Sequence, residues 1–277
     1  MAIIDRTDPA IPASSVSDAP GREVELSIVI PAFKESAKIA VDIRAAHSFL
    51  LAHKIEGEII VVDDGSPDDT AARALALAAE TPELRVLRYE QNRGKGHALR
   101  YGMTRSRGKK VMFADAGLCV PYEIMTIGLT MLDLGMCDIA HGSRRMRGSV
   151  KRAQPLYRRL GSLGYGLLIH TLMGIPPYLS DTNCGFKLYR REVAHELYGA
   201  AFTDGFMYDI EICLRAIAKR YMILEFPVLW SNDPDTRFNP STGSFRLLRD
   251  LAIIRWRLRP GSRRDAVRAV EPARSSG

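Results

Sequence analysis

The chain has 277 residues, 46% of them hydrophobic, which is enough to bury a full core in one main domain. Its formal charge of +7 and pI near 9.3 favour an anionic partner, and charge alone leaves a phosphate-bearing small molecule, a membrane surface and nucleic acid open. The four cysteines are widely spaced and form no Cys-x-x-Cys pair, which argues against a zinc ribbon or a disulfide framework and predicts a reducing, cytoplasmic location.

The two ends of the chain differ in composition from its middle. Residues 1–24 have neither the basic stretch nor the apolar core of a signal peptide, so we expect a flexible leader. Residues 259–277 are rich in Arg, Ser, Ala and Pro and predict a disordered basic tail. No apolar run reaches the roughly 20 residues that a membrane-spanning helix needs. One domain is therefore expected over residues 25–258.

From residue 26 onward, short apolar runs alternate with helical patterns, which is typical of βαβ units and a largely parallel sheet. The first strands are expected at residues 26–30, 57–62, 84–89 and 109–114, with helices at 36–52, 68–79 and 95–107. Later strands are expected at 137–142, 185–189 and 222–230. Pro227 predicts an edge position or a bulge for the last one. Residues 25–120 would form a nucleotide-binding half.

Two of the expected strands end in acidic residues. Asp63 and Asp64 close the second strand, and Asp115 closes the fourth in the run Asp115-Ala116-Gly117. Ligands of open α/β sheets gather at the carboxyl ends of the strands, so these ends predict a site for a nucleotide and a divalent metal. Asp63 and Asp64 would accept hydrogen bonds from a base or ribose, and Asp115 would bind the metal. The alternatives are an ordinary turn after the second strand and a helix cap at Asp115.

Two glycine- or proline-containing segments lie at expected strand-to-helix junctions. The segment Pro31-Ala32-Phe33-Lys34-Glu35 leaves Glu35 near the ligand crevice, although Glu35 also suits the first turn of a helix. The segment Arg93-Gly94-Lys95-Gly96-His97 suits a phosphate that approaches backbone N–H groups at a helix start. The alternative for the second segment is a turn with solvated cations.

Further polar motifs follow in the second half. Arg144 belongs to a basic loop that continues through Arg145, Arg147, Lys151 and Arg152. An arginine side chain can bind two oxygens of a phosphate, so the loop is a candidate phosphate site. The alternative is a run of solvated charges. Residues 181–187 and 206–211 add more acids. Asp209 and Glu211 are two positions apart and diverge on a helix, so Asp209 is the better site candidate and Glu211 would anchor the helix from behind.

In this order the motifs resemble those of the family 2 inverting glycosyltransferases of GT-A fold, over roughly residues 25–258. The resemblance is strongest to dolichyl-phosphate glucosyltransferases and polyprenyl-phosphate mannosyltransferases. Residues 30–35 match the family's "IPAYNE", residues 62–66 match "VDDGS" and residues 92–96 match "NKGKG". Residues 181–187 match "DTQCGFK", and residues 206–211 match "FDVE". The resemblance implies an α/β fold: a Rossmann-like, mostly parallel central sheet flanked by helices, with a small acceptor-side extension. Residues 121–258 would form the acceptor half.

The resemblance also implies an activity and a set of site residues. A hexose, glucose or mannose, would move from UDP-glucose or GDP-mannose to an acceptor, with Mg²⁺ or Mn²⁺ as the cofactor. The acceptor expected first is a polyprenyl or dolichyl phosphate; a soluble sugar hydroxyl, with Asp209 as base, and a non-catalytic nucleotide-sugar binding protein stay open. The implied donor-binding residues are Pro31, Ala32, Phe33, Glu35, Asp63, Asp64, Lys95, Asp115, Ala116 and Gly117. The implied acceptor-side residues are Asp181, Asn183, Asp209 and Glu211; Asp115, Asp209 and Arg144 would be catalytic, with Asp115 as the metal ligand.

Two departures from the family pattern bear on these expectations. The family's "DAD" is Asp115-Ala116-Gly117 here, and Cys119 stands where the mannosyl branch has a metal-binding Gln, so metal binding should depend more on the donor diphosphate. The chain also lacks a membrane helix. Docking on the cytoplasmic face of a membrane would use the basic loop and a helix with the apolar face Leu247, Leu248, Leu251, Ile254 and Leu258, unless that face packs on the core. Nucleic acid is not expected, because aromatic and basic residues are not interleaved.

Overall fold

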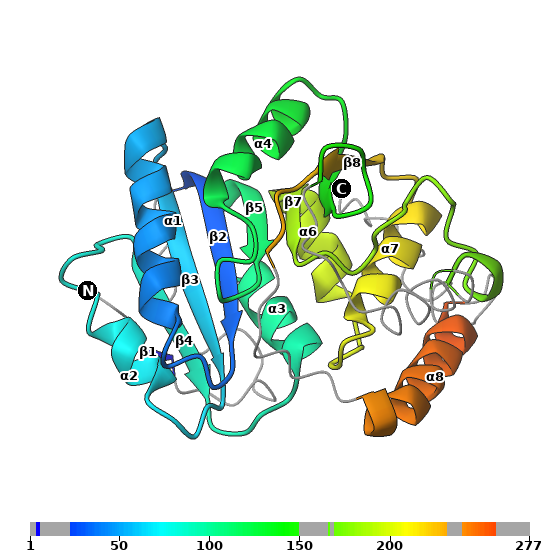
Figure 1. The fold of residues 1–277 in the computed structure, drawn as a ribbon, viewed down its shortest axis with the longest axis horizontal. Coiled ribbons are helices and arrows are strands. Elements are labelled where there is room, and N and C mark those ends of the chain that lie inside the picture. Colours follow the sequence, from blue (N-terminus) through cyan, green and yellow to red (C-terminus); the bar gives the residue numbers. More distant parts are fainter. Residues whose placement is uncertain (1–3, 6–22, 150–165, 167–168, 232–239, 259–277) are drawn as a thin grey trace, which may run out of the picture. The chain divides into compact units, whose positions relative to one another are not determined.

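The computed structural model describes residues 4–5, 23–149, 166, 169–231 and 240–258 (Figure 1). It divides into two compact units, residues 1–237 and 238–277. The second unit contains α8 (Pro240–Arg257), which the single expected domain of residues 25–258 had included. The expected leader contains a two-residue strand, β1 (Ile4–Asp5), while the expected tail at 259–277 lies outside the described residues.

The first unit is built on one sheet of eight strands, in the order β1-β4-β3-β2-β5-β7-β6-β8. After β1 the strands are β2 (Val24–Ala32), β3 (Gly57–Asp64), β4 (Leu84–Tyr89), β5 (Gly108–Ala114), β6 (Ile139–Ser143), β7 (Phe186–Arg190) and β8 (Ile223–Pro227). Strand β7 runs antiparallel to both of its neighbours, and every other pair is parallel. The expected mostly parallel sheet is confirmed.

Two groups of helices flank the sheet. In the first group α1 (Ile39–His53), η1 (Tyr122–Ile124) and α4 (Met125–Asp133) share one apolar cluster with the sheet. In the second group α3 (Lys95–Met103), α6 (Arg191–Gly199) and α7 (Tyr208–Ala218) contact one another. The short α2 (Thr70–Leu75) contacts α1, β3 and β4.

The alternation of side chains along β2 explains this layering. Leu26, Ile28 and Ile30 belong to the apolar cluster that includes Phe49 of α1. Val29 points the other way, because successive side chains of a strand face opposite sides. A Cβ atom on Gly102 of α3 would lie 2.6 Å from Val29 Cγ1, so a glycine is needed for α3 to pack this closely. Both faces of the sheet are therefore covered.

Element boundaries differ from the expected ones for physical reasons. Helix α1 begins at residue 39 rather than 36, because the backbone before it is held elsewhere: Lys34 N donates to Ser66 Oγ at 2.9 Å and Glu35 N to Thr70 Oγ1 at 2.9 Å. Strand β8 is the last of the sheet and ends at Pro227. The expected edge position is thus confirmed, as a proline without an N–H requires.

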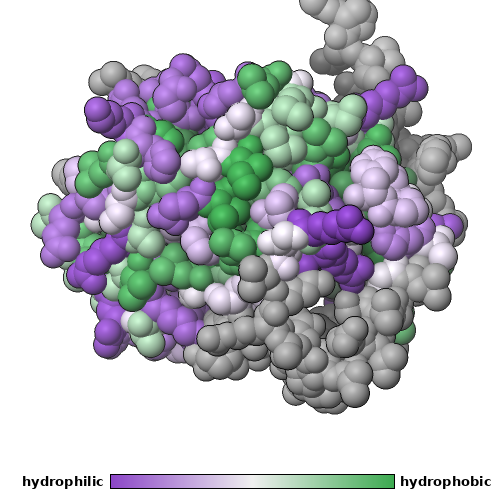
Figure 2. All heavy atoms as spheres, turned by 45° about the horizontal axis from the view of Figure 1, so that its top comes forward, coloured by the Kyte–Doolittle hydropathy of each residue, from purple (hydrophilic) through white to green (hydrophobic). Residues whose placement is uncertain are grey.

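Large apolar side chains are exposed at several places on the surface. Figure 2 shows a face on which apolar surface runs as a band through the middle, with hydrophilic side chains on both sides. In the predicted apolar face of α8, Leu251 and Ile254 are buried while Leu248 is 52% exposed. None of the helices in the described ranges combines the length and the hydrophobicity needed to cross a bilayer.

Candidate active site

Asp115, directly after β5, lies on the wall of a pocket at the carboxyl ends of the strands. Its backbone N donates to Gly185 O at 2.9 Å, which ties it to the start of β7. A Cβ atom at residue 185 would lie 2.0 Å from Asp115 Oδ2, so only glycine leaves room for the carboxylate. The pocket is lined by Ala114, Asp115, Cys119, Val120, Arg144, Asn183, Cys184, Gly185, Phe186 and Trp230.

Lys95 forms an ion pair with Asp115. It is the first residue of α3, and its Nζ lies 2.6 Å from Asp115 Oδ1 and 5.7 Å from the centre of the Tyr208 ring. Both side chains are partly exposed, 22% for Lys95 and 34% for Asp115. The start of α3 and the end of β5 thus bring a cation and a carboxylate together.

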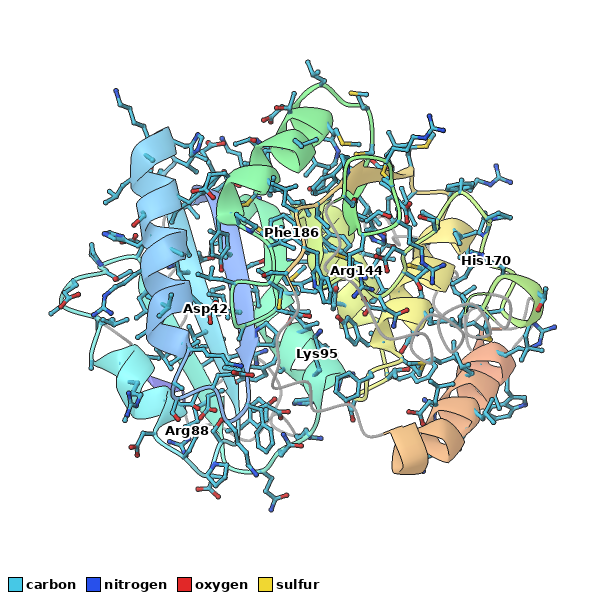
Figure 3. The ribbon with its side chains drawn as sticks, in the orientation of Figure 1. Asp42, Arg88, Lys95, Arg144, His170 and Phe186 are labelled. Atoms are coloured by element: carbon cyan, nitrogen blue, oxygen red, sulfur yellow. The ribbon has the colours of Figure 1, made fainter. Side chains whose placement is uncertain are left out.

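Arg144 reaches the same pocket from the end of β6 (Figure 3). Its Nε and Nη2 donate to the two carboxylate oxygens of Asp181 at 2.7 Å each, and its guanidinium lies 5.5 Å from the Trp230 ring centre. Burial alone would raise the pKa of Asp181, but the charge and hydrogen bonds of Arg144 outweigh it and lower that pKa. Asp181 is therefore occupied in holding Arg144, not in meeting an acceptor.

The two adjacent acids of β3 differ in what they contact. Asp64 accepts hydrogen bonds from Tyr89 Oη (2.8 Å), Asn92 Nδ2 (2.8 Å), Arg93 N (2.7 Å) and Gly94 N (2.9 Å). Its carboxylate holds the loop before α3 in place and has little capacity left for a base or ribose. The base or ribose contact expected of Asp64 stays a prediction.

Asp63 keeps acceptor capacity. It is buried, its Oδ1 accepts from Ser66 N at 3.2 Å, and Arg88 Nε lies 3.3 Å from its Oδ2. That Oδ2 has no hydrogen-bond partner among the described residues, and burial raises the pKa of the group. Pro31 and Ala32 pair in register with Val62 and Asp63, so the predicted donor contacts of β2 lie beside it.

The start of α3 is not the phosphate cradle that its glycines suggest. Gly96 N and His97 N both donate to Asp204 O, at 2.8 and 3.2 Å. A Cβ atom on Gly96 would lie 2.3 Å from Thr203 O, and one on Gly94 2.5 Å from Asp204 O. The glycines let the loop at 203–205 approach closely, so the N–H groups of Gly96 and His97 are occupied. The donor-side role of the Lys95 side chain stays a prediction.

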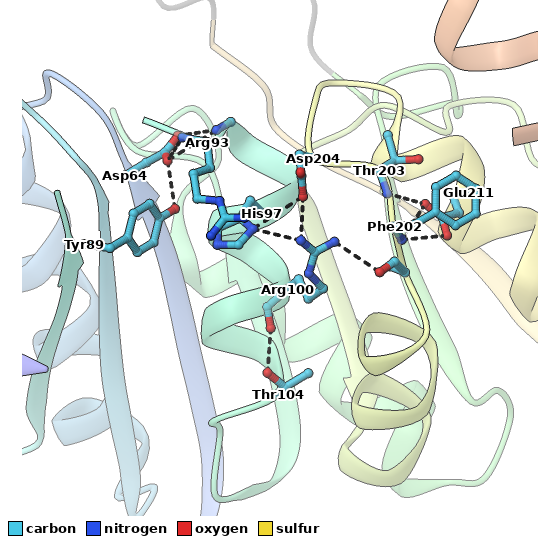
Figure 4. A network of polar contacts seen from close by, with 12 residues as sticks. Asp64, Tyr89, Arg93, His97, Arg100, Thr104, Phe202, Thr203, Asp204 and Glu211 are labelled. Carbon is cyan, nitrogen blue, oxygen red and sulfur yellow. Dashed lines mark hydrogen bonds and ion pairs between the residues drawn. The ribbon is translucent and has the colours of Figure 1, made fainter. Parts of the chain in front are cut away.

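Glu211 anchors that same loop from α7. Its carboxylate is buried and accepts from Phe202 N at 3.1 Å, Thr203 N at 2.8 Å and Arg215 Nε at 2.7 Å (Figure 4). The expectation that Glu211 supports the helix from behind fits this geometry. A direct acceptor contact does not, because the carboxylate is enclosed.

Asp209 is buried and paired. It forms an ion pair with Lys187 of β7, and Lys187 Nζ also donates to Thr182 O at 2.7 Å. Burial raises the pKa of Asp209, while the positive charges of Lys187 and Lys95 oppose the rise. As predicted, Asp209 and Glu211 diverge. Asp209 lies near the pocket, but only 4% of its surface is exposed.

Sequence reasoning missed the roles of three residues of this site. Lys187 and Gly185 lie inside the motif at 181–187, so the motif was seen but not their roles. Asp42 of α1 accepts hydrogen bonds from Gly117 N and Leu118 N, at 2.9 Å each to one of its oxygens. Nothing in its local sequence marks it, because an acid in the first turn of a helix is ordinary.

The groups around Asp115 fit a divalent cation only together with a donor. Within the described part of the chain no cluster of three or more His, Cys, Asp or Glu side chains is placed to bind a metal. A single carboxylate completed by substrate phosphates and water is, however, a usual arrangement for Mg²⁺.

The comparisons with known proteins agree with the fold. The model of the family "Glycosyl transferase family 2" matches residues 27–198. The chain is 33% identical over 261 residues to a dolichyl-phosphate beta-glucosyltransferase of Saccharomyces cerevisiae, covering 88% of this chain and 78% of the yeast protein. It is 31% identical to the human protein of that name, covering 90% and 79%.

Solved structures share the fold. Glucosyl-3-phosphoglycerate synthase from Mycobacterium tuberculosis, crystallised with Mn²⁺, UDP and phosphoglyceric acid, matches with a TM-score of 0.62 at 21% identity over 87% of this chain and 80% of that one. The expected GT-A fold and glycosyltransferase activity are confirmed. Fold, motif order and relatives together place this chain in glycosyl transferase family 2.

Proposed function

We propose that this chain transfers glucose from UDP-glucose to a polyprenyl-type lipid phosphate, with inversion at the anomeric carbon. The observation that carries the proposal is the pocket that Asp115 and Arg144 line and that Lys95 reaches through its 2.6 Å contact with Asp115. The names of the yeast and human relatives support glucose as the sugar and dolichyl phosphate as the acceptor. The UDP in the structural neighbour supports the choice of base.

The donor would lie along the ends of β2, β3 and β5. Asp63 is proposed to accept a hydrogen bond from the base, because its Oδ2 has capacity that Asp64 lacks. Arg144 and Lys95 would bind the diphosphate, since a guanidinium matches two phosphate oxygens and an ammonium adds a point charge. Phe33, Glu35, Ala116 and Gly117 stay predicted donor contacts.

Asp115 is proposed to hold Mg²⁺ or Mn²⁺ together with the donor diphosphate. Such a cation would neutralise the charge that builds on the leaving diphosphate. Arg144 contributes to the same end from the protein, because Asp181 fixes its guanidinium at the pocket wall before the reaction begins.

The state of Asp209 favours a phosphate acceptor over a hydroxyl. A sugar hydroxyl needs a base to remove its proton, and Asp209 is buried against Lys187, which leaves it poorly placed for that task. A lipid phosphate carries an ionised oxygen and needs no base. GDP-mannose is the second candidate donor, since the chain also resembles the mannosyl branch.

We further propose peripheral contact with the cytoplasmic face of a membrane. Met146 in the basic loop is 37% exposed beside Arg145 and Arg147, and on α8 Trp256 is 67% exposed between arginines. Exposed apolar side chains among cations suit a surface with anionic lipids. None of the four cysteines, which all lie in the described ranges, forms a disulfide.

The test follows labelled sugar from UDP-glucose or GDP-mannose to dolichyl phosphate in detergent, with Mn²⁺ or Mg²⁺. We expect a chloroform-soluble glucolipid from UDP-glucose, none from reactions without the lipid, and much less product from GDP-mannose. Transfer to a soluble glucoside but not to the lipid would reject the acceptor. Binding of UDP-glucose with no transfer and no release of UDP would leave the chain a binding protein.

A further inference from the structure

The turn that follows Asp115 has a strained backbone. Gly117 has φ of 95° and Leu118 has φ of 47°, so two consecutive residues lie in the left-handed region. A leucine rarely adopts positive φ, because its Cβ crowds the backbone carbonyl. Some contact must therefore hold the turn in this shape.

Asp42 of α1 supplies that contact (Figure 3). Its Oδ1 accepts from Gly117 N at 3.0 Å and from Leu118 N at 2.9 Å, and its Oδ2 lies 2.9 Å from Gly117 N. The side chain is buried, with 1% of its surface exposed. Successive N–H groups that converge on one carboxylate form an anion-binding concavity, and hydrogen bonds to a charged acceptor are strong.

The position of Gly117 makes this contact informative. Gly117 lies two positions after Asp115 and directs its backbone N–H to Asp42. The turn leads from Asp115 to Cys119 and Val120, which also line the pocket. Its shape therefore affects both the metal-binding candidate and the wall beside it.

The groups around Asp42 leave its charge sensitive to pH. The pKa of Asp42 is raised to about 6, chiefly by burial and also by the charge of Glu35. The hydrogen bonds from Gly117 and Leu118 and the charge of Lys38 act in the opposite direction. The buried Tyr122 hydroxyl on η1 is the other titratable neighbour, and its own pKa is raised by burial and by the charge of Asp42. The carboxylate is ionised at neutral pH and gains a proton in mild acid.

We propose that Asp42 is a positioning residue for the reaction: its carboxylate fixes the turn at 116–118 and so holds Asp115 at the pocket. The catalytic part of this inference rests on the proposed function. The structural part, that Asp42 holds the turn, does not.

Protonation of Asp42 should raise the stability of the fold and lower the activity. The folded-state pKa lies above that of an unfolded aspartate, so through this group the fold gains stability as the pH falls through about 6. Activity should fall over the same range, because the turn loses its charged acceptor. A residue that served stability alone would not produce this divergence.

The test compares Asp42→Asn with Glu58→Gln. Glu58 is an equally buried acid at the amino end of β3, where it accepts from Ser27 Oγ and Arg107 N, so it controls for the loss of a buried carboxylate away from the site. Hydrogen exchange of the peptide at 113–120 is measured first, at pH 7 and corrected for intrinsic rates. We expect exchange to rise roughly ten-fold in Asp42→Asn and to stay unchanged in Glu58→Gln.

The second readout is kcat for UDP release from UDP-glucose between pH 5 and 8. Wild type and Glu58→Gln should lose rate as the pH falls through about 6, while Asp42→Asn should be roughly ten-fold slower at pH 7 and lack that step. Unchanged exchange at 113–120 in Asp42→Asn overturns the proposal, whatever the reaction. Faster exchange with wild-type kcat and pH profile rejects the positioning role. Absence of UDP release from wild type would reject the proposed function, and the exchange result would still decide whether Asp42 holds the turn.

Discussion

The donor side and the acceptor side of this pocket use their acids differently. On the donor side Asp115 and Asp63 lie beside Lys95 and Arg88, but Asp115 is 34% exposed and Asp63 Oδ2 has no hydrogen-bond partner among the described residues. On the acceptor side every predicted acid is enclosed as well as paired with a cation of the chain: Asp181 with Arg144, Asp209 with Lys187 and Glu211 with Arg215. The difference teaches that an acid in a family motif can serve to fix a cation or a loop, and that its partner decides which role it has.

The largest expected effect comes from breaking the Lys187–Asp209 pair. Lys187→Met leaves Asp209 buried without its partner, and we expect the free energy of unfolding to fall by about 3–5 kcal/mol in thermal or urea unfolding. Lys109→Met removes a lysine from an exposed pair with Glu25 and should change stability little. Equal, small effects of both variants would show that the acceptor-side acid is not a structural one.

Next, Asp64→Asn and Asp63→Asn should separate the two adjacent acids. Asp64→Asn removes acceptor capacity for Arg93 N and Gly94 N and should lower stability by about 1–3 kcal/mol. Asp63→Asn should keep the melting temperature but weaken UDP binding on the order of ten-fold, measured by calorimetry. The reverse pattern would exchange their roles.

The smallest effect is expected from restoring an acid at residue 117. Gly117→Asp should tighten Mn²⁺ binding in the presence of UDP by a few-fold, because the gain is offset by the cost of a side chain at φ of 95°. Gly117→Asn carries a similar backbone cost without the charge and is the matched control. If both variants bind Mn²⁺ alike, residue 117 does not face the metal.

The sequence predicted the sheet well because its signals are local. Apolar runs with helical patterns between them located β2 to β5, and Pro227 correctly placed β8 at an edge, since a missing N–H is a property of one residue. The antiparallel direction of β7 and the strand at Ile4–Asp5 were not predicted, because pairing depends on distant partners.

The site was predicted less completely, because the contacts of its residues also depend on distant partners. Motifs identified Asp115 and Lys95, whose contact the fold then produced. They could not show that Asp64 would be surrounded by N–H donors or that Asp204 O would occupy the start of α3, because those partners come from loops far along the chain. Asp42 was missed because its role exists only once α1 lies against the turn after β5.

The most direct test of the central claim, that Asp115 binds a cation with the donor diphosphate, is UDP binding by calorimetry with and without Mn²⁺. We expect Mn²⁺ to strengthen UDP binding to the wild-type chain at least roughly ten-fold and to leave binding to Asp115→Asn unchanged, since the substitution removes the carboxylate proposed to hold the cation. The same Mn²⁺-dependent gain in Asp115→Asn would contradict the account.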